Sequence, residues 1–208
     1  MKKMMKTGLV ALAVTMMLSA GNALGASART DDGYGQGTAF SPLGLGFIPP
    51  VQFPGVEQDI VGFRLNILVG ENRDVSFLDI GSLANVVDGY LYGVQIAGIA
   101  NKVYASEGAI QIAGAVNYVE RGFAGLQIAG LANYAASDMN GFAIGCVNYV
   151  GGDFQGAQIG ALNLAGTAEG LQIGAFNYAK SLKGLQIGAI NVIETSPVPF
   201  LPVVNCCF

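Results

Sequence analysis

The chain has 208 residues, enough for one domain of ordinary size, and is 52% hydrophobic but only 12% charged, with a formal net charge of −4. Because about a quarter of the residues in soluble domains are charged, this composition excludes a disordered chain and favours a membrane, a fibre or close self-association. A negative chain is also repelled by phosphate, so nucleic acid is not an expected partner.

Residues 1–28 have the pattern of a secretory signal peptide. Basic residues precede an apolar run and small residues follow it; these are Lys2, Lys3, Lys6, Leu9 to Leu18, Ala26 and Ala28. The apolar run is shorter than the roughly 20 residues that a membrane-spanning helix needs. We therefore expect export and cleavage after Ala28, with Gly25 as the second choice, which would leave seven basic residues against 14 acidic ones, a net charge of −7. Asn22 stands where a lipoprotein would need Cys, so no lipid anchor is expected.

Residues 29–58 are rich in Gly and Pro and predict a poorly ordered N-terminal lead, and a repeat domain is expected at residues 59–193. There an Asn recurs every 14 to 16 residues, and ahead of each Asn stands a Gln, or a substitute for it, that is always followed by Ile. Eight copies fill residues 75–193, with Asp79 and Ala143 as substitutes, and Arg64 takes the Gln position in a degenerate ninth. The residues that we expect to form structural ladders are Gln95, Gln111, Gln127, Gln158, Gln172, Gln186, Asn85, Asn101, Asn117, Asn133, Asn148, Asn163, Asn177 and Asn191.

The repeat unit is typical of β-structure. In the copy GLQIGAFNYA, Leu171 and Ile173 point to one side of an extended segment and Gln172 points to the other. Glycine-containing turns interrupt every copy, and no copy is long enough to cross a membrane as a helix. Two all-β architectures accept such a period: a β-solenoid with one coil per repeat, and an up-and-down outer-membrane β-barrel with one strand per repeat.

Features of the sequence favour each architecture. The terminal Phe208 and the aromatic residues after the repeat Asn are typical of barrels; the latter are Tyr118, Tyr134, Tyr149 and Tyr178. Against a barrel, the bulky residues change sides between Ile173 and Phe176, which a corner near Gly174 explains. The Gln-to-Asn separation also shrinks from six residues to five along the chain, a slip that would reverse every later side chain in a flat strand. We therefore predict a β-solenoid of tandem 14–16-residue repeats, with the barrel as the alternative.

Stacked coils would bring identical residues of neighbouring repeats together. We expect Ile on Ile and Leu on Leu to build a continuous core, and Gln and Asn to hydrogen-bond along the stack. Cys146 occupies a position where other copies have Ala or Leu, so we expect a small buried residue there.

Residues 194–208 are expected to cap the stack. Their prolines, Pro197, Pro199 and Pro202, would stop a ladder from adding further strands. The segment also holds Cys206 and Cys207, which with Cys146 make an odd number of cysteines, so no disulfide framework is indicated.

The sequence contains no pattern of a catalytic or metal site. The absence of His excludes Ser-His and Cys-His nucleophile pairs and His-containing metal sites. One acidic residue per copy falls near the turns, at Glu107, Glu120, Asp138, Asp153 and Glu169. These carboxylates could form a row that attracts cations, but no copy has the clustered oxygens of a calcium loop, so we interpret them as solubilising turn residues. We predict that the protein is not an enzyme and has no cofactor and no catalytic, cofactor-binding or metal-binding residues.

The unit G-L-Q-I-G-x-x-N, the opening GFRLNILVGENRDVSFLDIG and the ending PFLPVVNCCF resemble a family of bacterial surface-repeat proteins, known from leptospiral and other outer-membrane-bearing bacteria. The resemblance covers about residues 48–208 and implies an exported envelope protein, but no activity. The absent lipid-attachment Cys departs from relatives that look like lipoproteins. A looser likeness, over half of each repeat, is to curli-type amyloid repeats, whose pattern Q-x-G-x-x-N-x-A fits residues 158–165 and 172–179.

These observations predict an exported, non-enzymatic repeat protein at the outer membrane or cell surface of a Gram-negative-type bacterium, acting as a structural or interaction surface. The alternatives are an integral outer-membrane β-barrel protein and an extracellular, amyloid-like fibre subunit. The expected partners are further copies of the chain or other envelope components, and membrane association is compatible with the composition.

Overall fold

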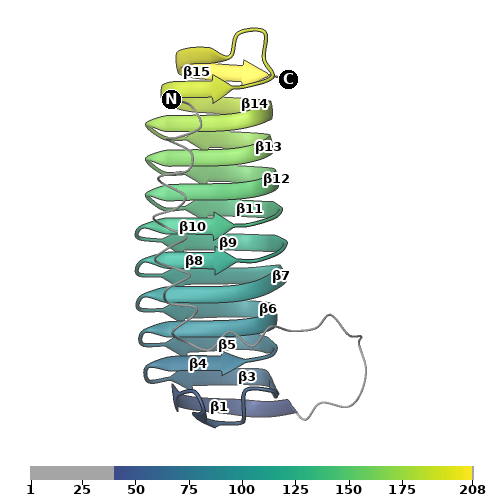
Figure 1. Ribbon diagram of the computed structural model, residues 1–208, viewed down its shortest axis with the longest axis vertical. Coiled ribbons are helices and arrows are strands. Elements are labelled where there is room, and N and C mark those ends of the chain that lie inside the picture. Colours follow the sequence, from purple (N-terminus) through teal and green to yellow (C-terminus); the bar gives the residue numbers. More distant parts are fainter. Residues whose placement is uncertain (1–39, 208) are drawn as a thin grey trace. The chain divides into compact units, whose positions relative to one another are not determined.

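The computed structural model describes residues 40–207, which form an all-β unit without helices, a β-solenoid of about 10 turns (Figure 1). The expected signal peptide, the first part of the Gly/Pro-rich lead and Phe208 lie outside the described residues. The strands are β1 (Phe40–Ile48), β2 (Val51–Phe53), β3 (Asp59–Asn66), β4 (Val69–Asn72), β5 (Val75–Gly81), β6 (Ala84–Ala97), β7 (Ala100–Ala113), β8 (Val116–Val119), β9 (Phe123–Ala129), β10 (Ala132–Ala135), β11 (Met139–Ile144), β12 (Val147–Ile159), β13 (Leu162–Ile173), β14 (Phe176–Ile193) and β15 (Phe200–Cys207).

Successive coils pair in parallel and in register. β12, β13 and β14 place Gln158, Gln172 and Gln186 directly beside one another, and the same register runs back through the earlier coils to Asp79 in β5 and Arg64 in β3. The predicted solenoid is therefore confirmed. The barrel alternative is wrong, because an up-and-down barrel requires antiparallel neighbours.

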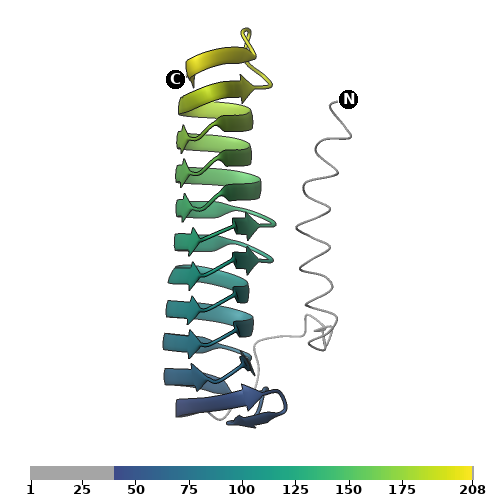
Figure 2. The same cartoon turned by 90° about the vertical axis from the view of Figure 1, so that its left-hand side faces the viewer.

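Each coil bends sharply between its Gln half and its Asn half, so that the coil forms two layers, as the side view shows (Figure 2). In the copy that contains Gln172, the bend falls at Gly174 and Ala175, at the expected corner. A Cβ atom on Gly174 would lie 2.2 Å from the carbonyl oxygen of Gly160 and 2.6 Å from Nδ2 of Asn163, so only glycine fits. The separation between the Gln and Asn positions shortens from six residues to five at the equivalent bend between Ile144 and Val147, and the register of both layers continues unchanged across it.

A second column of glycines lies two residues ahead of the Gln position. Their φ angles are between +133° and +143° in the later coils, at Gly125, Gly141, Gly156, Gly170 and Gly184. A Cβ atom on Gly170 would approach the carbonyl oxygen of Gly156 to 2.0 Å. Phe77 occupies this column in β5 with a φ of +102°, a conformation that costs a residue other than glycine about 1–3 kcal/mol.

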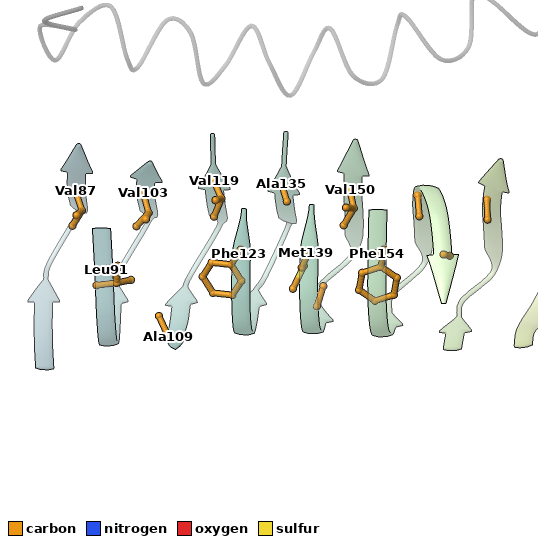
Figure 3. Close-up of a cluster of buried hydrophobic side chains, with 14 of the residues drawn as sticks. Val87, Leu91, Val103, Ala109, Val119, Phe123, Ala135, Met139, Val150 and Phe154 are labelled. Atoms are coloured by element: carbon orange, nitrogen blue, oxygen red, sulfur yellow. The ribbon is translucent and has the colours of Figure 1, made fainter. Parts of the chain in front are cut away.

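One half of the solenoid interior is apolar and consists of two facing columns of hydrophobic side chains (Figure 3). One column is the residue two positions after each Asn, and the other is the residue four positions before most of the Gln positions. Small and large side chains combine across the coil, as with Val119 and Phe123 or Ala135 and Met139. The cluster comprises Ile60, Val75, Val87, Leu91, Val103, Ala109, Val119, Phe123, Ala135, Met139, Ala143, Val150, Phe154, Ala165, Ala168, Ala179, Leu182 and Ile193.

The expected core of repeat Ile and Leu residues is wrong. Ile159 and Ile187 are 40% and 38% exposed, whereas the neighbouring Gln158 and Gln186 are fully buried. The coil is narrow, and amides that hydrogen-bond in continuous rows can be buried without loss of hydrogen bonds. The larger aliphatic side chains therefore take the outer side of the same strands.

Antiparallel strands close both ends of the stack. β2 pairs with β1, and β15 pairs with β14, so that Gln186 lies opposite Asn205. The segments around these two strands contain Pro49, Pro50, Pro54, Pro197, Pro199 and Pro202. Because proline has no N–H to donate, these ends are poor templates for another strand.

Candidate functional site

The buried glutamines form a ladder whose hydrogen bonds all run in one direction. Nε2 of Gln111 donates to Oε1 of Gln95 at 2.9 Å, and Nε2 of Gln127 donates to Oε1 of Gln111 at 2.8 Å. The C-terminal coils repeat the pattern at 2.7 Å. All six expected glutamines are fully buried: Gln95, Gln111, Gln127, Gln158, Gln172 and Gln186.

The asparagines form a second ladder that runs in the opposite direction. Nδ2 of Asn117 donates to Oδ1 of Asn133 in the next coil and to the carbonyl oxygen of Ile128, both at 2.9 Å. The second bond satisfies a main-chain carbonyl where the chain leaves its strand for the bend. The eight expected asparagines are all buried: Asn85, Asn101, Asn117, Asn133, Asn148, Asn163, Asn177 and Asn191.

An ion pair begins the glutamine ladder. Oδ2 of Asp79 accepts from Nε2 of Gln95 at 2.9 Å, and both side chains are fully buried. Arg64, also buried, donates to the same carboxylate and to Oδ1 of Asn72. Since a carboxylate that is paired with Arg64 can only accept hydrogen bonds, Asp79 determines which way the amides of Gln95, Gln111 and Gln127 point.

The glutamine ladder is interrupted at Ala143. Oε1 of Gln127 has no hydrogen-bond partner there, and Nε2 of Gln158 reaches the carbonyl oxygen of Leu164 instead, at 3.4 Å. At the C-terminal end, Oε1 of Gln186 is likewise without a partner. The sequence shows the first interruption directly, because Ala143 stands in the Gln position.

One ladder residue is missing from the sequence-based set. Asn66 stands in the column that holds Gly or Ala elsewhere, and Gly70 stands in the Asn column, beside Asn85. Nδ2 of Asn66 donates to Oδ1 of Asn85 at 2.9 Å, and a Cβ atom on Gly70 would lie 2.0 Å from Cγ of Asn66. The two positions have exchanged residues, so the period alone could not find this pair.

The outer side of the Gln strands is an uncharged apolar surface, which we call the Leu/Ile face. It consists of the two residues that flank each Gln position on ten successive rungs: Leu43 and Leu45, Phe63 and Leu65, Leu78 and Ile80, Val94 and Ile96, Ile110 and Ile112, Leu126 and Ile128, Phe142 and Ile144, Ala157 and Ile159, Leu171 and Ile173, and Leu185 and Ile187. β15 adds Cys206 and Val204 as an eleventh rung. Apolar patches of this length on a monomer mark sites of interaction.

Four bulky bend residues border the N-terminal part of the Leu/Ile face. They follow the Ile column at the corner of the coil and are well exposed: Ile67, Leu83, Ile99 and Leu131. The face itself is most exposed near the N-terminal end, where Phe63 is 53% exposed and meets Phe77 edge to face at 5.2 Å between ring centroids.

The outer side of the Asn strands carries aromatic and charged side chains. Tyr118, Tyr134 and Tyr149 stack with centroid separations of 5.3 and 4.8 Å. One coil earlier, Lys102 occupies the same column as the Tyr residues. Its Nζ lies 3.1 Å from Oε1 of Glu120 and 3.5 Å from Oδ1 of Asp88. The stacked rings present their edges rather than their faces, so they offer no flat platform to a ligand.

Glu71 lies in the same column as Lys102, one coil before Val86. Burial, the charge of Asp88 and a hydrogen bond with Asp88 raise the pKa of Glu71 to about 7. This side of the solenoid therefore changes its charge near neutral pH.

The structure also corrects the prediction for Cys146 and adds two findings. Cys146 is exposed, not buried. It occupies the same repeat position as Leu131, and this position lies on the outside of the bend. Among residues 40–207 there is no group of three His, Cys, Asp or Glu side chains that could hold a metal ion. The described part of the chain also contains no helix long and apolar enough to cross a membrane.

The comparisons with known proteins leave the site without an assigned relative. No family model matches the chain, and neither a curated protein nor a solved structure matches it. The resemblance to bacterial surface-repeat proteins therefore stays a prediction. The buried positions of the described coils hold hydrogen-bonded amides, apolar side chains and the Arg64–Asp79 ion pair, so the extended feature suited to recognition is the Leu/Ile face on the outer side.

Proposed function

We propose that this protein is an exported, non-enzymatic repeat protein of the bacterial cell envelope that acts as a structural interaction surface through its Leu/Ile face. The observation that carries the proposal is the uninterrupted row of uncharged apolar pairs from Leu43 to Ile187 on the outside of the solenoid. Burying such a surface against a partner is favourable by about 25 cal/mol per Å². The signal-peptide pattern of residues 1–28 supports the export part.

The interior supports a structural role rather than a catalytic one. Asn and Gln side chains, which would be needed to bind a polar substrate, are used along the stack, as in the bond of Asn117 to Asn133. An interior whose amides pair along most of the stack makes the solenoid rigid, and rigid surfaces lose little entropy when they bind a partner.

The closed ends count against the fibre alternative. β15 covers the edge of β14 with an antiparallel strand that contains Pro202, and β2 covers part of β1. A chain that added copies end to end would need open, in-register edges at both ends. Lateral association through the Leu/Ile face requires no change at either end.

Export is tested by expressing the full chain with a C-terminal tag in a bacterium that has an outer membrane. We expect a mature N-terminus at Arg29, and we expect the protein in the envelope fraction. The control, Leu12→Arg, breaks the apolar run and should leave an uncleaved chain in the cytoplasm. A wild-type chain that keeps its N-terminus and stays in the cytoplasm would refute the proposal.

A further inference from the structure

The Leu/Ile face is long and narrow. At about 4.8 Å per coil, the rungs from Leu43 to Val204 extend over about 48 Å. Its two columns are two residues apart, about 7 Å, and with their side chains they form a strip about 10 Å wide. Two copies that meet along this strip would bury roughly 1,000 Å² in total, which is the lower limit for a specific interface.

The charge distribution favours a second copy of the chain over a lipid surface. Neither column of the face contains a charged residue, and next to the C-terminal rungs Glu169 and Lys183 lie side by side in register, where their charges offset each other. The chain has no Trp, and without residues 1–28 it has seven basic residues against 14 acidic ones. Anionic headgroups attract surfaces rich in Lys and Arg, which this face is not.

A second copy presents the same uncharged columns at the same spacing. In a two-fold arrangement the same patch serves both partners, so Leu and Ile columns of one copy can fit between those of the other. Sheets packed in this way lie about 10 Å apart. A two-fold dimer uses the whole face and adds no further copies. This agrees with the two ends of the solenoid, which are covered by β2 and β15.

We infer that the Leu/Ile face is the interface of a face-to-face homodimer. The inference rests on the proposed function, because it names the partner of the same surface. It places Leu126, in the sixth of eleven rungs, at the centre of the interface. Packing around this rung excludes water in both possible two-fold orientations, parallel and antiparallel.

The association state of the secreted mature chain provides the first test, by light scattering and sedimentation over a dilution series. We expect a dimer at micromolar concentration. Ile128→Lys, at the centre of the face, should weaken the dimer by about 30-fold or more, as for a residue at an interface hot spot. The matched control is Leu164→Lys, which changes a half-buried aliphatic residue on the Tyr side of the solenoid and should leave the dimer intact.

Crosslinking with a short bismaleimide tests the geometry without relying on a destabilising charge, because sheets about 10 Å apart exceed the reach of a disulfide. In a background of Cys146→Ala, Cys206→Ala and Cys207→Ala, we expect Leu126→Cys chains to be joined into a covalent dimer, because the central rung of one copy faces the central rung of the other in either orientation. Leu164→Cys in the same background should stay monomeric on a denaturing gel. Efficient crosslinking at residue 164 and none at residue 126 would overturn the inference.

The remaining outcomes separate this inference from the proposed function. A mature chain that is monomeric at all concentrations, yet binds vesicles of phosphatidylethanolamine and phosphatidylglycerol through residue 128, would overturn the dimer and leave the envelope role standing. A monomer that binds no vesicles but is still exported would overturn the dimer alone. A wild-type chain that stays uncleaved in the cytoplasm, as is expected only of Leu12→Arg, would refute the proposed function whatever the association state.

Discussion

Arg64 binds both carboxylate oxygens of Asp79, through Nε at 2.7 Å and Nη2 at 2.5 Å, inside the first coils of the solenoid. Both side chains are buried, so neither charge can be compensated by water. Replacing Arg64 by Met would leave a buried, uncompensated carboxylate, and we expect a loss of about 3–5 kcal/mol in the free energy of unfolding.

The double variant Arg64→Gln with Asp79→Gln would extend the amide ladder by two rungs in place of the ion pair. We expect it to recover most of the stability that either single change removes. Urea unfolding of the wild type, Arg64→Gln, Asp79→Gln and the double variant gives the four free energies of a double-mutant cycle. Losses that simply add would show that the two positions do not act as one unit.

Filling the interruption in the glutamine ladder should stabilise the fold. Ala143→Gln supplies a donor to the unpaired Oε1 of Gln127 and an acceptor to Nε2 of Gln158. The control Ala143→Met has a similar volume but no amide. We expect the Gln variant to be more stable than the Met variant by about 1–3 kcal/mol in thermal or urea unfolding. Equal stabilities would mean that the neighbouring amides gain nothing from a new rung.

The Phe77 position should prefer glycine to alanine, the reverse of the usual order in a strand. Its φ of +102° is unfavourable for any residue with a Cβ atom, and its column holds Gly62 and Gly93 in the adjacent coils. Both small variants lose the contact with Phe63, so their difference isolates the backbone strain. We expect Phe77→Gly to exceed Phe77→Ala by about 1 kcal/mol in the free energy of unfolding.

The matched pair for this comparison is Leu78→Gly and Leu78→Ala, one residue along in the same strand. Here alanine should be the more stable, by about 0.5–1 kcal/mol. The same order at both positions would contradict backbone strain at Phe77.

The 14- to 16-residue period of the sequence predicted the solenoid, but it did not predict which side chains face the interior. The alternation in residues 170–179 separates Leu171 and Ile173 from Gln172, yet alternation alone does not say which side faces inward. Hydrophobicity suggested that the aliphatic residues face inward, and this was wrong. Variation between copies carries the missing signal: the residue before Gln ranges from Ala157 to Phe142, a spread of volume that an outer position accepts and a narrow interior does not.

The ladders could be foreseen residue by residue where the repeat is regular. The exchange of Asn66 with Gly70 could not, because it depends on the side chain of Asn66 reaching, from the other layer, the space that is left free at Gly70. The exposure of Cys146 was missed for a related reason: its position lies on the bend, and a bend residue is neither inside nor outside the alternating pattern.

The raised pKa of Glu71 predicts a dependence of stability on pH. In the unfolded chain the pKa of a Glu lies near its ordinary value of 4.5, whereas in the fold burial and Asp88 raise the pKa of Glu71 to about 7. Between these values the folded state binds more protons, so the free energy of unfolding should fall as the pH rises through this window. Lys102 and Arg64 partly offset the effect by favouring the ionised form.

Urea unfolding of wild type and Glu71→Gln at about pH 5 and pH 8 checks this dependence. The variant should lose less stability than the wild type between the two values. Glu169→Gln, which changes an exposed carboxylate far along the stack, serves as the control and should behave like the wild type. Identical losses in Glu71→Gln and wild type would exclude Glu71 as the titrating group.

Removal of residues 194–208 should convert the protein from a closed unit into one that associates end to end. The deletion uncovers the edge of β14, whose 18 residues then present unpaired main-chain groups in the register of a repeat. We expect thioflavin T fluorescence and elongated particles in electron micrographs, with a β-rich circular dichroism spectrum retained. A truncated chain that stays as small as the full-length protein would show that the cap is not what prevents growth.

The opposed polarity of the two amide ladders has a consequence for how such a molecule can change its length. In the asparagine ladder the N–H ends point toward the C-terminus, as from Asn117 to Asn133, and in the glutamine ladder they point toward the N-terminus, as from Gln111 to Gln95. Amide dipoles that would add along either row therefore cancel within each coil, unlike those of an α-helix. A tandem duplication of one 14- to 16-residue unit inserts a coil that is electrostatically neutral to its neighbours, so copy number can drift while the two caps and the surface pattern stay unchanged.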